Sequence, residues 1–113
     1  MLERMIQHIT ARSSDPFIYF RADGSVGDVN QHFIECIGNI NSITQLVEIT
    51  GLDNDLLKEK GISRHLFKLP GEGFFLLVLA PLITEDISVG WLCLLLRTDS
   101  LPDEYIRHDD QTI

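Results

Sequence analysis

Cysteine and basic residues are both scarce in this sequence of 113 residues. The two cysteines, Cys36 and Cys93, are too few for a disulfide framework, so we expect a reducing, cytoplasmic environment. Nine Lys and Arg stand against 17 Asp and Glu, which gives a formal net charge of -8. Binding to nucleic acid or to an anionic membrane surface needs clustered cations, and these are scattered. The composition therefore argues against both kinds of partner.

Long hydrophobic runs are missing as well. The longest run, Phe74 to Ile83, is too short to cross a bilayer and contains Pro81. The N-terminus carries Glu3, Arg4 and His8 among its apolar residues, so it has no continuous apolar stretch of the kind found in secretory signals. The length predicts one domain with one core. We expect a soluble, cytoplasmic domain without membrane contact.

The first third of the chain predicts a helix followed by a β-hairpin. Residues 1–13 place apolar side chains at helical spacing, and Pro16 ends this segment. Phe17 to Arg21 is aromatic and β-branched, Ala22 to Ser25 has turn chemistry, and Val26 to Val29 forms a second short strand. The apolar stripe of the first helix consists of Leu2, Met5, Ile6 and Ile9.

Three short helices are predicted in the middle of the chain. Asn30 is a good N-cap for the first, which runs to about Ile37. Ser42 and Gln45 fit the capping box of the second, and Asp53 caps a third that runs to Lys60. The expected helix ends are Gly38, Gly51 and Gly61, and the apolar side of the second helix is expected to hold Ile43, Leu46, Val47 and Ile49.

The last third predicts three strands, at 64–69, 74–80 and 89–97, with a hairpin loop at 81–88. Segregated helices and strands favour an α+β fold with an antiparallel sheet and helices on one face. Because the last two strands are apolar on both faces, something must cover the second face. The N-terminal helix, alone or with a partner subunit, is the expected cover. Residues 100–113 are acidic and predict a tail or a linker to a missing output domain.

This order of elements resembles a PAS (sensory box) domain over residues 14–99. The stretch from Asp15 to Asn30 looks like the opening hairpin of that family, and Gly90 to Arg97 looks like its last strand. The resemblance implies a five-stranded antiparallel sheet flanked by short helices. It also implies a non-catalytic sensory or dimerisation module of a bacterial regulator, with an output such as a diguanylate cyclase or a histidine kinase. In the family, the N-terminal helix often packs on the outer sheet face and dimerises.

The sequence also departs from the PAS pattern. Arg97-Thr98-Asp99 stands where many members have Asp-Ile-Thr before a cyclase or kinase. The Asn-Cys-Arg-Phe-Leu-Gln signature of flavin-binding members is absent, and the short helical middle has no counterpart of the haem-ligating helix. The first departure bears on coupling to the output domain, and the other two argue against flavin and haem. They leave a small ligand, or none, between the sheet and the helices.

Candidate sites are few. His32 and Cys36 lie four residues apart and share a helix face, so a small enzyme using this pair is one alternative. The apolar neighbours of Cys36 favour a buried structural cysteine instead, and we assign no catalytic or metal-binding residue. A ligand-free α+β scaffold is the other alternative. Ligand-cavity lining is predicted for Phe33, Cys36, Ile37, Leu46, Phe67, Phe75 and Trp91, and a homodimer contact for Leu2, Met5, Ile6, Ile9 and the outer sheet face.

Overall fold

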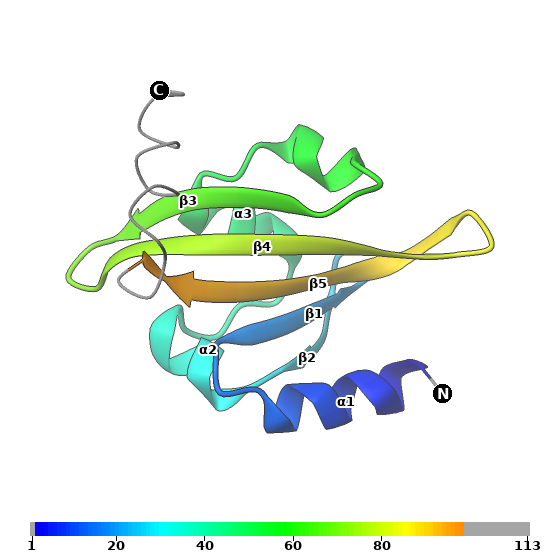
Figure 1. Cartoon of the computed structure of the whole chain (residues 1–113), viewed down its shortest axis with the longest axis horizontal. Helices are drawn as coiled ribbons and strands as arrows, with labels where there is room; N and C mark the ends of the chain where they lie inside the picture. Colours follow the sequence, from blue (N-terminus) through cyan, green and yellow to red (C-terminus); the bar gives the residue numbers. More distant parts are fainter. Residues whose placement is uncertain (1, 99–113) are drawn as a thin grey trace.

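The computed structural model describes residues 2–98, with side chains from residue 4 onward. A five-stranded antiparallel sheet forms in the order β2-β1-β5-β4-β3 (Figure 1), which confirms the predicted α+β fold. The predicted tail at 100–113 lies outside the described residues. The elements are α1 (Leu2–Arg12), β1 (Phe17–Arg21), β2 (Val26–Val29), α2 (Gln31–Cys36), α3 (Ile43–Thr50), the 3-10 helix η1 (Asn54–Lys58), β3 (Ser63–Leu69), β4 (Gly73–Thr84) and β5 (Ile87–Arg97).

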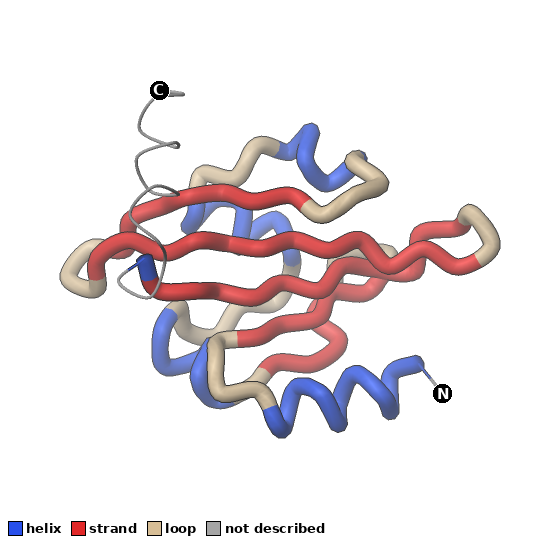
Figure 2. The backbone as a smooth tube through the Cα atoms, in the orientation of Figure 1, coloured by secondary structure: helices blue, strands red, loops and turns tan. Residues whose placement is uncertain are grey.

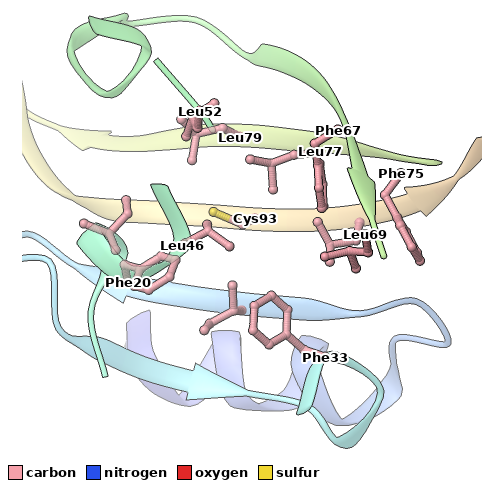
Figure 3. Close-up of a cluster of buried hydrophobic side chains, with 13 residues drawn as sticks. Phe20, Phe33, Leu46, Leu52, Phe67, Leu69, Phe75, Leu77, Leu79 and Cys93 are labelled. Carbon is pink, nitrogen blue, oxygen red and sulfur yellow. The ribbon is translucent and has the colours of Figure 1, made fainter. Parts of the chain in front are cut away.

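The two faces of the sheet are covered differently. The inner face packs against α2, α3 and η1, whereas α1 lies over β1 and β2 at one edge of the sheet (Figures 1 and 2), with Leu82, Leu92 and Leu94 bordering its buried contacts. The inner cluster joins strand residues such as Phe20, Phe75 and Cys93 to helix residues such as Phe33 and Leu46 (Figure 3). Strands β4 and β5 therefore carry apolar side chains toward both faces, as their sequence predicts.

Asn30 ties α2 to β1 and to the segment before β1, and it confirms the predicted N-cap. Its Oδ1 accepts hydrogen bonds from the backbone N–H of Phe33, at 2.9 Å, and of Phe17, at 3.1 Å. Its Nδ2 donates to the carbonyl of Asp15 at 2.8 Å. The same amide thus starts α2 and fixes the point where the chain enters β1.

The predicted capping box of α3 is wrong. The side chain of Ser42 makes no capping hydrogen bond, and Gln45 Oε1 instead accepts from the backbone N–H of Asn41. The reason is tertiary: Ser42 forms a β-bridge with Ser25, and the next N–H, that of Ile43, donates to the carbonyl of Gly24. The β1–β2 hairpin therefore holds the start of this helix.

The apolar side of α3 also differs from the prediction. Ile49 is 42% exposed, while Thr50 is buried and its Oγ1 donates to the carbonyl of Leu46. A threonine that bonds its own helix backbone leaves no unpaired hydroxyl in the core, so it can occupy an inward position. At the next element the prediction holds, because Asp53 Oδ1 accepts from the N–H of Asp55 and caps η1.

The predicted loop at 81–88 is wrong, because β4 and β5 continue through it as one long hairpin. The turn is Glu85–Asp86, and both residues have positive φ, 52° and 64°. Two such residues give a two-residue turn whose twist matches the strands. Pro81 is tolerated because β4 pairs with β3 only as far as Leu79, so Pro81 lies where β4 has a single neighbouring strand.

The predicted apolar stripe of α1 is divided between two environments. Ile6 is only 3% exposed and packs with Phe17 and Tyr19, whereas Met5 is 58% and Ile9 48% exposed. The side chain of Leu2 lies outside the described residues. Because α1 lies over one edge of the sheet, only one side of this helix is buried, and part of its apolar surface stays exposed.

Candidate functional site

The residues predicted to line a cavity lie in one cluster between the sheet and the helices. Phe33, Leu46, Phe67 and Phe75 are buried, and Cys36, Ile37 and Trp91 pack against them as half-buried residues. The rings of Phe67 and Phe75 stack with centroids 5.9 Å apart. Figure 3 shows the side chains of Phe33 and Leu46 facing those of the strands. Ligand binding by this cluster stays a prediction.

Open cavities lie toward the two ends of the sheet. The first, of about 470 Å³, is at the start of β1 and the end of β5, and brings together Pro16, His32, Cys36 and Arg97. The Arg97 guanidinium lies 3.9 Å from the Glu72 carboxylate and 5.1 Å from the centre of the Phe75 ring. Charged groups therefore dominate the mouth of this cavity.

The structure does bring His32 and Cys36 to the same cavity, as their spacing predicts. Burial raises the pKa of the Cys36 thiol, and the nearby Arg97 opposes this only in part. A nucleophilic cysteine needs the opposite shift, toward the thiolate. Among residues 4–98 no hydrogen bond joins the two side chains, and no cluster of three or more His, Cys, Asp or Glu could hold a metal ion. The geometry gives this pair no activated nucleophile.

His65, in β3, is held by a backbone carbonyl. Its Nε2 donates to the carbonyl of Thr50 at 2.8 Å, and its ring stacks on Phe67 with centroids 6.2 Å apart. Cys93 is fully buried in the inner cluster, and burial raises the pKa of its thiol far above the ordinary range. Cys93 therefore has a structural place in the core, and the half-buried His65 is held by its backbone and ring contacts.

The second cavity, of about 430 Å³, lies between η1 and the β4–β5 hairpin. The indole N–H of Trp91 donates to the carbonyl of Leu57 at 3.2 Å, which ties this 3-10 helix to β5. Pro81 and Ile83 supply apolar walls, and Lys58 and Lys60 supply cations. Sequence reasoning found Trp91 but missed the other four, because it placed Pro81 and Ile83 in a loop and the two lysines at the end of a predicted helix.

Among residues 2–98, no helix combines the length and the apolar character that crossing a membrane requires. Comparison with known proteins found no matching family model and no matching curated protein. One similar solved structure is the crystal structure of the PAS domain of an HTR-like protein from Haloarcula marismortui, at 17% identity and a TM-score of 0.49. The match covers 84% of this chain and 96% of that one. The five-stranded antiparallel sheet with short helices on one face is the fold that the resemblance to a PAS domain implies.

Proposed function

We propose that this chain is a non-catalytic PAS-type sensory module that works as a homodimer in a cytoplasmic bacterial signalling regulator. The observation that carries the proposal is the unequal covering of the sheet. Short helices close one face, while on the other face α1 packs over Phe17 and Tyr19 of β1 and leaves Phe74 of β4 half exposed. A small ligand or partner biases one arrangement of sheet and helices, and the terminal segments pass that bias to an output domain such as a cyclase or a kinase.

Exposed apolar side chains support the dimer. Met5 and Ile9 stand out from α1, and the outer face over β3 and β4 exposes half of Phe74, with Leu66 and Val78 only half-buried beside it. Contact with water does not stabilise apolar side chains, and exposed apolar patches often mark a surface that binds a partner. A second copy of the chain would bury both surfaces at once.

The strand pairing supports a relay to the two terminal segments. Strand β5 pairs with both β1 and β4, and at its far end the N–H of Leu95 donates to the carbonyl of Pro16 at 3.0 Å. Pro16 lies just after α1, and Arg97 ends β5. A shift of β5 along β1 would therefore reach the beginning and the end of the domain together.

The test is the mass of the chain in solution by sedimentation or light scattering. The double substitution Met5→Lys and Ile9→Lys should convert a dimer to a monomer, because it places charges in the proposed contact. Gln7→Lys adds one positive charge at another exposed position of α1 and should leave the dimer intact. A monomeric wild-type chain, or a double variant that stays dimeric with unchanged circular dichroism, would refute the dimer.

A further inference from the structure

The cavity between η1 and the β4–β5 hairpin has the size and lining of a small-molecule site. Its volume of about 430 Å³ falls within the range of roughly 300–1,000 Å³ typical of ligand pockets. It lies where β4 and β5 continue past the other strands (Figure 2), so a ligand could enter from solvent. It borders the central cluster, since Leu57 and Trp91 pack against that cluster and also line the cavity.

The walls favour a flat apolar group. Trp91, Pro81 and Leu57 line the cavity as half-buried side chains, and Ile83 is 43% exposed. The indole N–H of Trp91 already donates to the carbonyl of Leu57. What Trp91 offers a ligand is therefore ring surface, which suits stacking on another flat group.

The rim carries charges of both signs that are not paired with one another. Lys58 and Lys60 line the cavity on the η1 side, together with Glu59 and, from the hairpin turn, Asp86. None of the four side chains takes part in an ion pair within residues 4–98. Two ammonium groups and two carboxylates complement a ligand that itself carries one carboxylate and one ammonium group.

We propose that this cavity binds a free amino acid with a flat apolar side chain. The proposal rests on the sensory function above and names the ligand class and its place. The apolar side chain lies against Trp91 and Pro81, the carboxylate faces the two lysines, and the ammonium group faces Glu59 and Asp86. Because η1 is bonded to β5 through Trp91, a ligand between them bears directly on the strand that reaches both ends of the domain.

Trp91 is the only tryptophan of the chain, so its fluorescence reports on this cavity directly. The wild-type chain is titrated with L-phenylalanine, with 3-phenylpropanoate, which lacks the ammonium group, and with 2-phenylethylamine, which lacks the carboxylate. Phenylalanine should give a saturable change in emission and bind about tenfold tighter than either analogue. No saturable change with phenylalanine, or equal binding of one analogue, would overturn the proposal.

Variants locate the site. The pair Lys58→Ala and Lys60→Ala should weaken phenylalanine binding by about tenfold, and both residues are exposed, so the fold is kept. Lys68→Ala removes an exposed lysine whose Nζ lies over the Phe74 ring, and it should bind phenylalanine like the wild type. Equal affinity in all three proteins would overturn the site.

The two proposals fail separately. A small molecule retained in native mass spectra, together with a Trp91 emission that does not respond to phenylalanine, removes this site and leaves the sensory function. A monomeric wild-type chain removes the proposed dimer, and the titration still decides the ligand class.

Discussion

At the scale of single residues, Asn30 and Gly90 decide much of the geometry around β1, the first through its side-chain amide and the second because it has no side chain. Asn30 satisfies the backbone N–H groups of Phe17 in β1 and Phe33 in α2, and the carbonyl of Asp15 before β1. Gly90 lies so close to β1 that a Cβ there would be 2.2 Å from the Phe20 carbonyl oxygen. The ring of Tyr19 fills the outer face beside it, with its hydroxyl donating to the carbonyl of Val89 at 3.3 Å.

Asn30→Ala should lower the free energy of unfolding by about 2–3 kcal/mol, because two buried N–H groups lose their acceptor and α2 loses its cap. Urea denaturation measures this loss. Asn39→Ala, at an exposed position of the following loop, should change it by less than about 0.5 kcal/mol. Similar losses in the two variants would contradict the role given to Asn30.

Gly90→Ala should destabilise the domain by on the order of 3 kcal/mol, since the new methyl group forces β5 away from β1 and φ there is 143°. Gly61→Ala is the matched control, because nothing lies within 4 Å of a Cβ at that position. Thermal unfolding of the two variants compares them. A soluble, wild-type-like Gly90→Ala protein would show that the close approach of the strands is not required.

The buried thiol of Cys93 should make the free energy of unfolding fall at alkaline pH. Burial raises the pKa of its thiol above the ordinary 9.0, so the unfolded chain releases this proton first as the pH rises. The stabilisation that comes from keeping this thiol protonated is complete below about pH 9, and it is lost progressively as the pH rises above that value. Urea midpoints between about pH 8 and about pH 10 should fall less steeply for Cys93→Ala than for the wild type. Parallel curves would show that the thiol is not the group responsible.

At the scale of elements, helices and strands differ in how much their own sequence specifies. The hairpin of β1 and β2 and the cap at Asn30 agree with prediction, because turn and cap signals act within a few residues. The start of α3 and the length of β4 and β5 do not, because Ser25 pairs with Ser42 and because the edge position of Pro81 exists only in the assembled sheet.

The way α1 docks on β1 can be tested at Ile6, the single buried apolar residue among residues 4–12. Ile6→Ala should weaken docking of this helix by roughly 2 kcal/mol, because Ile6 is its buried apolar contact with Phe17 and Tyr19. Amide exchange in α1 should then speed up while the sheet stays protected. Ile9→Ala removes a side chain that is 48% exposed and should leave exchange within the isolated domain unchanged. Equal acceleration in both variants would contradict the one-sided docking.

At the scale of the whole molecule, the acidic charge opposes the compact state. With a net charge of -8, the excess carboxylates repel one another, and added salt screens this repulsion. The thermal midpoint should therefore rise by a few degrees between low salt and physiological ionic strength. Replacing the exposed Glu48 and Glu59 by Gln should reduce that rise. A midpoint that falls with salt would mean that attractive ion pairs outweigh the net repulsion.

The sequence by itself determined the order of elements, the α+β class and the need to cover a sheet that is apolar on both faces, because propensity, turn chemistry and periodicity are local properties. Only the tertiary structure decided which face each strand residue takes, how α1 divides its apolar stripe, and that Lys58, Lys60, Pro81 and Ile83 meet Trp91 at one cavity. Residues distant in sequence come together through strand register and packing, and neither is written in any one segment.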